Sequence, residues 1–319
     1  MLQQTRVPTV VERYPVFLRE FPCVEALAAA GPGRVCEAWA GLGYYTRALN
    51  LHRAAVTIMA EHAGRLPSTA AELTGLAGIG RYTAGAVASI AYGEQVPVVD
   101  GNVVRVLCRV FAIGSAPDKN STKSRLWALA EQLVRGEGPG DFNQAIMEHG
   151  ALVCTPLGPR CPACPIRAEC AACARGDPTR WPAKTKAPTV KRLDVAFVYL
   201  RDGRGVWLTR RPLSGLWAGL WELPSAQGPH ARAELSARLR LQLGRPVGLV
   251  RHALTHRLVT ARIYAPHPVA RLRTGQGLRR FSDPLTAPLT GLARKAIVAA
   301  AKGDRTTTPE IAIMKGRRY

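Results

Sequence analysis

The chain has 319 residues, of which 47% are hydrophobic, and its formal net charge is +22. This length is sufficient for two domains, and the lack of any apolar run of membrane-spanning length excludes a transmembrane protein, so a soluble protein is expected. The charge is concentrated in the second half: residues 1–150 hold 14 Lys and Arg against 13 Asp and Glu, whereas residues 151–319 hold 30 against 9, which favours nucleic acid or an anionic membrane surface as a partner.

Three helical stretches are predicted before residue 63. Hydrophobic residues recur at helical spacing over residues 7–21, a second stretch covers 27–39, and a helix reaching His62 follows a glycine-rich turn at 41–48. No capping residue precedes the first stretch, and nothing at Met1 resembles a signal peptide, so we expect the chain to begin inside a longer element.

Two adjacent tyrosines, Tyr44 and Tyr45, lie in that turn. Core packing explains at least one of them. The alternative for the other is an aromatic side chain that wedges into a base stack.

Residues 76–85 predict a tight turn that leads into a helix. Gly78 and Gly80 flank one apolar residue, which suits positive φ and close backbone approach, and a helix is expected from Thr83 to Tyr92 with Gly93 ending it. The first N–H groups of such a helix could bind a phosphate. On spacing alone, an ordinary helix-turn-helix corner explains the pattern equally well.

Asp100 stands where a helix N-cap is expected, because Val103, Val106, Leu107 and Val110 follow at helical spacing. Its simplest role is that cap. The alternative is a carboxylate that faces a sugar whose phosphates the preceding turn holds.

Residues 76–85 together with 99–102 resemble the hairpin and catalytic aspartate of the helix-hairpin-helix DNA glycosylase superfamily. The resemblance implies that Asp100 faces a flipped-out nucleotide. The endonuclease III-like lyases of this superfamily carry a Schiff-base lysine where this chain has Tyr82. Because a lyase needs that amine, Tyr82 favours plain hydrolysis of an N-glycosidic bond.

Residues 1–7 and 41–45 are similar to segments of MutY-type adenine DNA glycosylases, a family that removes adenine mispaired with 8-oxoguanine. Matched positions imply intercalation by Gln4 and Tyr44, and contact with the oxidised guanine by Thr5 and Leu42. Glu148 matches a second carboxylate that lines the adenine pocket; its alternative is a solvated helix glutamate.

This chain departs from the family pattern at its N-terminus. There, the glutamate that protonates the adenine comes two residues before the Met that is residue 1 here. We therefore expect this acid and the helices before it to be missing, through either a start codon assigned too far downstream or a true truncation. Glu37, in a different helical stretch, is not its equivalent.

Eight cysteines without a secretory signal favour a reduced compartment, and Cys23, Cys36 and Cys108 are expected in the core. Four others have the spacing Cys-x6-Cys-x2-Cys-x5-Cys: Cys154, Cys161, Cys164 and Cys170. Zinc sites commonly use two Cys-x2-Cys pairs, so the asymmetric spacing favours a 4Fe-4S cluster, with zinc as the alternative. The spacing also matches the cluster loop of the endonuclease III and MutY families, which selects Cys170 over Cys173 as the fourth ligand.

A basic, proline-containing linker is expected at residues 176–192, followed by an α+β domain. We predict a β-hairpin of 195–200 with 206–209, a helix at 232–243 and strands near 249–265. Residues 211–224 resemble the MutY C-terminal domain, whose fold is similar to MutT. The predicted helix carries only Glu234 where a working Nudix hydrolase needs several glutamates for its metal, so no nucleotide hydrolysis is expected.

The remaining role of this domain is recognition. Residues 252–256 align with the loop that reads 8-oxoguanine in the family, although Leu254 and Thr255 depart from its Phe-Ser while His256 is kept. The basic tail from residue 302 is expected to be disordered.

We therefore predict a multidomain protein: an all-α helix-hairpin-helix glycosylase domain with a 4Fe-4S loop (1–173), a linker (174–192), an α+β MutT/Nudix-like domain (193–301) and a tail (302–319). Its partner is double-stranded DNA with an adenine:8-oxoguanine or adenine:guanine mismatch, on which it acts as a monomer in the cytoplasm, at the nucleoid, with no membrane. The expected catalytic residues are Asp100, Tyr82, Glu148 and Asn102. The expected DNA-binding residues are Gln4, Thr5, Arg6, Leu42, Tyr44, Gly78, Gly80, Arg81, Thr255 and His256.

Two rivals stay open. An endonuclease III-like lyase acting on oxidised pyrimidines is disfavoured by Tyr82 and by the long C-terminal domain. A non-catalytic DNA-binding or redox-sensing iron-sulfur module is favoured by the missing acid.

Overall fold

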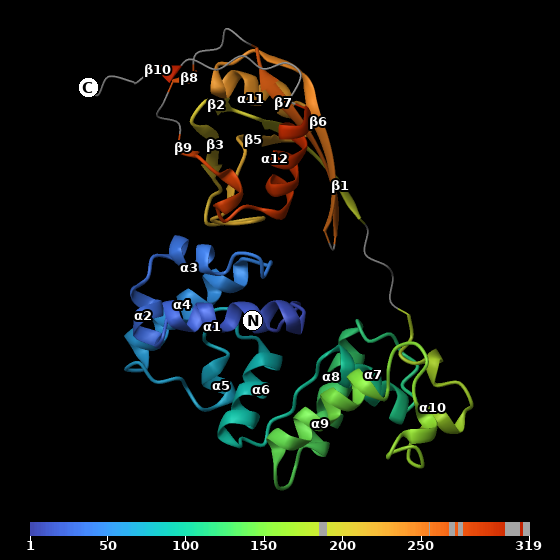
Figure 1. The fold of residues 1–319 in the computed structure, drawn as a ribbon. Helices are drawn as coiled ribbons and strands as arrows, with labels where there is room; N and C mark the ends of the chain where they lie inside the picture. Colours follow the sequence, from blue (N-terminus) through green and yellow to red (C-terminus); the bar gives the residue numbers. More distant parts are fainter. Residues whose placement is uncertain (185–189, 255, 268–271, 274–276, 304–312, 315–319) are drawn as a thin grey trace. The chain divides into compact units, whose positions relative to one another are not determined.

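The computed structural model describes the chain outside residues 185–189, 255, 268–271, 274–276, 304–312 and 315–319 (Figure 1). The chain divides into two compact units: Met1–His52 together with Pro188–Tyr319, and Arg53–Ala187. None of the described helices has the length and apolar character needed to cross a bilayer.

The first unit begins with short helices that pack through aromatic side chains. They are α1 (Val7–Glu20), α2 (Val24–Ala29), α3 (Pro32–Ala38) and the start of α4 (Thr46–Glu61). Phe17 of α1 contacts Phe21 and Trp39, with ring centroids 4.9 and 5.7 Å apart. The helices predicted at 7–21 and after the turn at 41–48 are confirmed, while the stretch at 27–39 is interrupted between α2 and α3.

The second part of this unit is an α/β sandwich. Its elements are β1 (Lys191–Val198), β2 (Arg201–Asp202), β3 (Gly205–Arg210), β4 (Trp221–Glu222), β5 (Ser225–Gln227), α11 (Ala231–Leu239), β6 (Leu243–Leu254), β7 (Arg257–Pro266), β8 (Leu272–Arg273), β9 (Leu278–Phe281), α12 (Gly291–Gly303) and β10 (Ile313–Met314), with a 3-10 turn, η3, at Pro284–Thr286. One sheet has the order β5-β1-β7-β6, with β1 parallel to β7; in the other, β3 pairs with β2, β4 and β9; β8 pairs with β10.

Alternation along β1 explains why helices cover both faces of the first sheet. Val195 and Phe197 belong to a core with α12, whereas Ala196 and Val198 belong to a core with α11. Successive strand residues point to opposite faces, so this doubly apolar strand needs a helix on each side. Figure 1 shows α11 and α12 beside the strands in this arrangement.

The predicted hairpin of 195–200 with 206–209 is wrong. β1 pairs with β5 and β7, while β3 lies in the other sheet. The hairpin that forms is shorter: Arg201 and Asp202 pair with Val206 and Gly205, and the N–H of Trp207 donates to the carbonyl of Leu200. The turn was placed correctly, but a pairing partner is a non-local property that the strand pattern does not carry.

Other boundaries also differ from prediction. The helix predicted to Leu243 ends at Leu239, because Arg240 adopts the left-handed conformation and caps it. β1 begins at Lys191, within the segment expected to be linker. Of the predicted tail, residues 302–303 end α12 and Ile313–Met314 pair with β8, and the rest lies outside the described residues.

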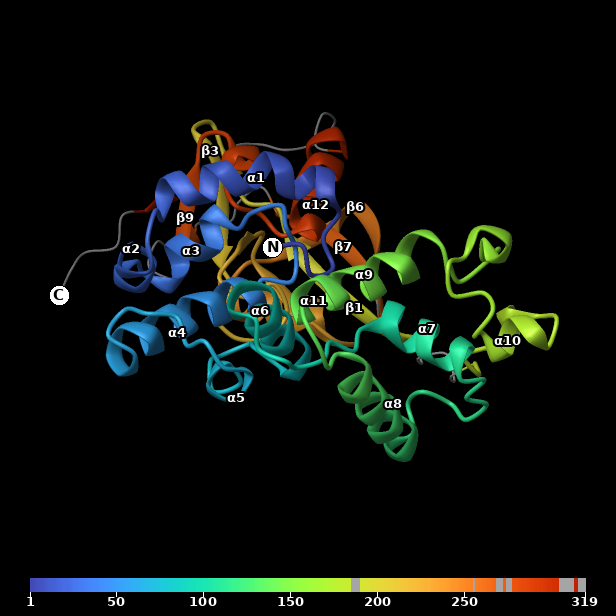
Figure 2. The same cartoon turned by 90° about the horizontal axis from the view of Figure 1, so that it is seen from below.

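The second unit is helical. After the end of α4 it contains α5 (Ala70–Leu73), α6 (Arg81–Tyr92), α7 (Gly101–Val110), α8 (Asn120–Leu133), α9 (Pro139–Leu152) and α10 (Ala171–Ala174), with 3-10 turns η1 (Cys161–Ala163) and η2 (Pro178–Arg180). α9 packs against α6 and α7, and α10 packs against α7 (Figure 2). Trp181, expected in the linker, is buried in this helical core. A helical N-terminal part followed by an α+β domain agrees with the predicted fold class.

Candidate functional site

The turn before α6 leaves open space at a helix N-terminus. Gly78 has φ 80°, a conformation that suits glycine, and Gly80 is the N-cap of α6. Gly80 is extended (φ −88°), so the expectation of positive φ is right for Gly78 and wrong for Gly80. A Cβ at Gly80 would have no neighbour within 4 Å. The predicted end of this helix at Gly93, which is left-handed, is confirmed.

Two side chains of the first turn of α6 have different surroundings. Arg81 is exposed and stacks on Trp127, with its guanidinium carbon 3.8 Å from the ring centroid. Tyr82 is half-buried, and its hydroxyl contacts the sulfur of Met147 at 3.5 Å. Burial raises the pKa of Tyr82, and the negative charge of Asp100 adds to this.

Asp100 is the N-cap of α7, as predicted. Its Oδ1 accepts from the backbone N–H of Val103 at 2.8 Å, and its Oδ2 accepts from Nδ2 of Asn102 at 3.0 Å. Among the described residues, no Lys or Arg forms an ion pair with this half-buried carboxylate. Neutral donors therefore orient Asp100 while its negative charge stays uncompensated by direct pairing.

Arg105 extends the hydrogen-bond network of Asp100, because it contacts Asn102. Its Nη2 donates to Oδ1 of Asn102 at 2.8 Å and to the carbonyl of Gly150 at 2.6 Å, and its Nε donates to the carbonyl of Cys154 at 2.7 Å. A Cβ on Gly150 would lie 2.7 Å from Cβ of Asn102, so glycine there lets α9 approach the start of α7. Hydrogen bonds thus connect Asp100 to the cysteine-containing segment.

Asn143 of α9 braces the segment that leads to Asp100. Its side chain is 1% exposed, accepts from the N–H of Val98 at 3.1 Å, and donates to the carbonyl of Val96 and the hydroxyl of Ser89, each at 2.9 Å. All its polar atoms are used, as a buried amide requires. This residue fixes the extended backbone between α6 and α7.

Arg109 is a buried cation that holds the start of the cysteine loop. It is 1% exposed, and its guanidinium donates to the carbonyls of Trp181, Cys154, Thr155 and Pro156 at 2.8 to 3.2 Å. Nη1 also donates to Sγ of Cys154 at 3.3 Å. The positive charge is therefore satisfied by carbonyl dipoles and one sulfur.

Five cysteines line one pocket beside Arg109 and His149: Cys154, Cys161, Cys164, Cys170 and Cys173. Burial, and then neighbouring thiols, raise the pKa of Cys161 and of Cys164. Cys173 also contributes to the raised pKa of Cys161, so the structure places the four predicted ligands along one pocket but does not separate Cys173 from them. Within the described residues, no three His, Cys, Asp or Glu side chains are grouped closely enough to hold a metal ion.

The predicted intercalating residues lie on the first unit. Gln4 and Tyr44 are exposed and adopt positive φ (56° and 45°). Thr5 donates to the carbonyl of Leu42 at 3.0 Å, and Arg47 donates to the Thr5 hydroxyl at 2.8 Å and lies 5.8 Å from the Tyr44 ring centroid. Arg47 thus ties the two segments together.

Burial separates the two tyrosines of the turn. Tyr45 is buried and its hydroxyl accepts from the N–H of Gly41 at 3.1 Å, whereas Tyr44 is 50% exposed. The core role that the sequence predicts for one of them is therefore that of Tyr45. The side chain of Leu42 is 4% exposed, which leaves its backbone as the accessible part.

The remaining predicted residues are on or near the surface. Arg6 is exposed, as is Glu148, one position after Met147 in α9. In the α+β domain, residues 252–254 end β6 and His256 lies exposed in the turn before β7, where its carbonyl accepts from the N–H of Lys191. Thr255 lies outside the described residues.

Sequence reasoning missed four of the residues that build these sites: Arg47, Arg105, Arg109 and Asn143. One signal could have found two of them, because Arg105 and Arg109 are one helical turn apart in a helix that is otherwise largely apolar. A charged residue on a buried helix face needs internal partners.

Two family models match the sequence: the HhH-GPD superfamily base excision DNA repair protein over residues 1–132, and the NUDIX domain over residues 195–297. These matches confirm the predicted helix-hairpin-helix and MutT/Nudix-like parts of the fold class.

The chain is similar to the adenine DNA glycosylase of Homo sapiens, with 37% identity over 321 residues that cover 83% of this chain and 59% of the human protein. It is similar to the adenine DNA glycosylase of Buchnera aphidicola subsp. Schizaphis graminum, with 32% identity over 225 residues, 70% of this chain and 65% of that protein. It therefore spans less than two thirds of the length of either relative. The solved structure of a thermostable thymine-DNA glycosylase has a TM-score of 0.50 and 31% identity, and the match covers 55% of this chain and 80% of that one.

Proposed function

Because this chain belongs to the adenine DNA glycosylase family, within the HhH-GPD superfamily of base excision DNA repair proteins, we propose that it hydrolyses the N-glycosidic bond of adenine mispaired with 8-oxoguanine or guanine in double-stranded DNA. The proposal includes action as a monomer in the cytoplasm, at the nucleoid.

The geometry of Asp100 is the observation that carries this proposal. Loss of a base from a deoxyribose develops positive charge on the sugar, as in other glycoside hydrolyses. A carboxylate held by two neutral donors keeps its full charge and a fixed orientation, so it can stabilise that charge without first breaking an ion pair. Asp100 is assigned this role, and Asn102 is assigned to orient it.

Tyr82 supports hydrolysis rather than lyase chemistry. Burial, and then the charge of Asp100, raise its pKa, so its hydroxyl stays protonated at neutral pH. A neutral phenol is no substitute for the amine that forms a Schiff base. Glu148, exposed on the same helix as Met147, is assigned to the wall of the adenine pocket.

DNA binding is assigned to three parts of the described chain. The open N-terminus of α6, with Gly78, Gly80 and Arg81, suits a phosphate. The exposed Gln4 and Tyr44, held by the contacts of Arg47 and Thr5, suit entry into a base stack, and Arg6 suits a nearby phosphate. His256, with Thr255 beside it in sequence, is assigned to recognition of the oxidised guanine.

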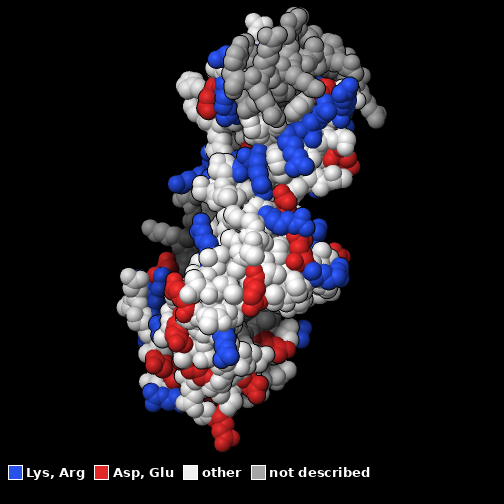
Figure 3. All heavy atoms as spheres, turned by 90° about the vertical axis from the view of Figure 1, so that its left-hand side faces the viewer, with Lys and Arg blue, Asp and Glu red and all other residues white. Residues whose placement is uncertain are grey.

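The distribution of basic side chains supports a DNA-binding role for the α+β domain. On the face shown in Figure 3, Lys and Arg gather over this domain, while Asp and Glu are more frequent over the helical part. This follows the excess of basic residues in the second half of the sequence.

We also propose that Cys154, Cys161, Cys164 and Cys170 hold a 4Fe-4S cluster. The residues present fit such a group, because a pocket lined by thiols and one buried guanidinium suits an anionic iron-sulfur centre. When bound, the cluster would brace the loop from Cys154 to Cys173, and no bond-breaking step is assigned to it.

Single-turnover release of free adenine from an adenine:8-oxoguanine duplex tests the activity. We expect free adenine, an intact abasic strand and no covalent adduct after borohydride reduction. Release is followed over hours, with a thymine:8-oxoguanine duplex as the control. Borohydride trapping on an oxidised-pyrimidine duplex would instead support a lyase, and duplex binding with no adenine release would support a non-catalytic module.

Metal analysis tests the cluster separately. We expect iron and sulfide after anaerobic purification, with Cys170→Ser losing more iron than Cys173→Ser. Stoichiometric zinc would contradict the cluster, and equal iron loss in the two variants would contradict the choice of Cys170.

A further inference from the structure

The loop between β3 and β4, residues 211–220, holds an aromatic residue in a backbone conformation that favours glycine. Trp217 has φ 58°, and the nearby Gly215 and Gly219 have φ 79° and 75°. Glycine adopts this conformation without steric cost, whereas a bulky side chain is strained in it. Strained residues persist only where the surrounding structure fixes them, and they concentrate at functional sites. The proposed glycosylase reaction assigns no role to Trp217.

Backbone hydrogen bonds close this loop. The N–H of Arg211 donates to the carbonyl of Leu220 at 2.8 Å, and the N–H of Gly219 donates to the carbonyl of Pro212 at 3.0 Å. The N–H of Leu220 donates to the carbonyl of Trp217 at 3.3 Å. The backbone of Trp217 is therefore held inside a closed loop, which explains how the strained conformation is kept.

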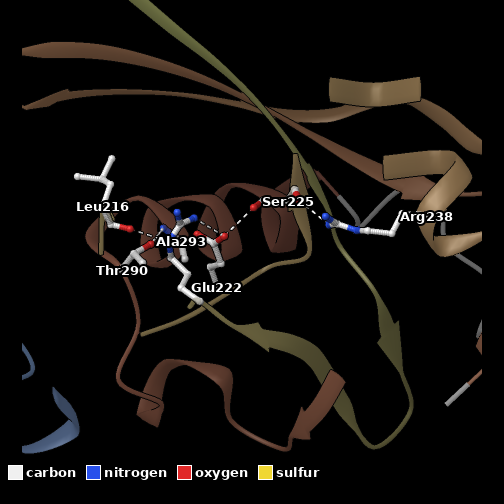
Figure 4. Close-up of polar contacts among 7 residues, drawn as sticks. Leu216, Glu222, Ser225, Arg238, Thr290 and Ala293 are labelled. Carbon is white, nitrogen blue, oxygen red and sulfur yellow. Dashed lines mark hydrogen bonds and ion pairs between the residues drawn. The ribbon is translucent and has the colours of Figure 1, made fainter. Parts of the chain in front are cut away.

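The side chain of Arg211 braces the loop from within (Figure 4). It donates from Nε to the carbonyl of Leu216 at 2.8 Å and from Nη1 to Oε1 of Glu222 at 2.7 Å. The hydroxyl of Ser225 donates to the same Oε1 at 2.6 Å, and Glu222 is 3% exposed, so the anchor of Arg211 is itself fixed. The guanidinium carbon of Arg211 lies over the ring of Trp217, 5.8 Å from its centroid. Arg211 thus contacts both the backbone before Trp217 and its ring.

The ring of Trp217 contacts His252 of β6. The two ring centroids are 6.1 Å apart, a separation typical of aromatic pairs, and the ring planes are inclined by 58°. Within the part of the chain that the structure describes, the buried Nδ1 of His252 has no hydrogen-bond partner. Packing, rather than a hydrogen bond at Nδ1, therefore orients this imidazole, and Trp217 is an aromatic part of that packing.

His252 lies close to the turn between β6 and β7 that carries His256. It is two residues before Leu254, which ends β6, and it pairs with Val259 of β7. Because a strand rises about 3.3 Å per residue, the end of β6 is about 7 Å from His252. Leu254 and Trp217 also pack against the same hydrophobic core. A shift of His252 would therefore reach the turn through only two strand residues.

We propose that Trp217 is a positioning residue for lesion recognition, which acts through His252 on the turn between β6 and β7. This inference rests on the proposed function, because that turn is assigned to the oxidised guanine. Guanine and 8-oxoguanine differ only at C8 and N7, so discrimination between them requires base contacts of exact geometry. Contacts with phosphates do not carry this information. Trp217 should therefore affect discrimination more than general DNA affinity.

Competition binding at fixed salt tests the proposal, with the full chain and duplexes that carry adenine opposite 8-oxoguanine or guanine. Trp217→Gly is the sharpest variant, because glycine removes the ring and suits φ 58°. We expect its preference for 8-oxoguanine over guanine to fall about tenfold, while its affinity for an undamaged duplex is kept. The matched control is Trp207→Leu, because Trp207 lies in the same domain and contacts Asp202 and Arg280 instead. Its preference ratio should stay within about twofold of wild type.

Two further measurements separate positioning from a merely structural role. His252→Ala should lower the preference as much as Trp217→Gly does, and the double variant should lower it no further, because both act through one contact. In the free protein, amide exchange should become faster at residues 250–259 of Trp217→Gly and stay unchanged at residues 193–198 of β1.

An unchanged preference in Trp217→Gly, an equal loss in Trp207→Leu, or additive losses in the double variant would overturn the proposal. So would unchanged amide exchange at residues 250–259. Each of these results would leave adenine release by the wild type, and thus the proposed function, intact. A wild type that releases adenine but does not prefer 8-oxoguanine would overturn the recognition role of the turn and this proposal with it.

Discussion

Asp100 of the helical unit and Glu222 of the α+β domain are both carboxylates near arginines, and they differ in one contact. Glu222 accepts directly from Arg211 at 2.7 Å, whereas Asp100 accepts from Asn102, and Arg105 donates to the far side of that asparagine. In a direct ion pair, the arginine compensates the negative charge of the carboxylate. An intervening amide orients the carboxylate without compensating its charge, which can then act on a ligand.

The two carboxylates also differ in burial. Glu222 is almost fully buried, and burial raises its pKa despite the opposing effects of Arg211 and Ser225. Asp100 is half-buried at the start of α7, where the helix dipole also favours a negative charge. This difference supports the catalytic role proposed for Asp100 and a structural role for Glu222.

The largest expected effect separates the two carboxylates by activity. Asp100→Asn should slow adenine release by about a thousandfold, because it removes the charge that stabilises the sugar cation. Glu222→Gln should leave the rate within about threefold. Single-turnover assays at saturating enzyme measure both, and a comparable loss in the two variants would break the distinction.

A second prediction concerns Arg109, whose guanidinium donates to four backbone carbonyls and to the sulfur of Cys154. Arg109→Met should destabilise the loop after α9 by about 3 kcal/mol, or roughly a hundredfold in local opening, because buried carbonyls lose their donor. Amide hydrogen exchange of residues 101–110 and 153–160 measures this. Arg125→Met, at an exposed position in α8, is the control, and equal protection in the two variants would contradict the role of Arg109.

Arg105→Gln should have the smallest of these effects. Because Arg105 reaches Asp100 only through Asn102, we expect adenine release to fall about tenfold while duplex affinity is kept. Arg135→Gln, an exposed arginine after α8, controls for the loss of charge. A parallel fall in duplex affinity would mean that Arg105 acts on DNA binding rather than through Asp100.

Local signals in the sequence were sufficient for the parts of the site that depend on neighbouring residues. The end of α6 at Gly93 and the cap of α7 by Asp100 follow from residues within one turn, and both were predicted. The converging cysteines also follow from their spacing together with the family resemblance.

Contacts between distant segments could not be predicted in this way. Asn143 lies about forty-five residues from the backbone it braces, and the pairing of β1 with β7 rather than β3 depends on the whole sheet. The same holds for Arg109, whose partners include the carbonyl of Trp181 in a segment that composition assigned to a linker.

Asn102→Lys tests the central claim most directly, because it places an ammonium beside Asp100 and recreates the direct pairing of Glu222 while keeping the carboxylate. The account predicts that adenine release falls to about the level of Asp100→Asn, with duplex affinity and thermal stability close to wild type, and that Gly101→Lys, one position earlier and exposed, falls much less. Adenine release by Asn102→Lys within about threefold of wild type would contradict the claim that Asp100 works because its charge is left unpaired.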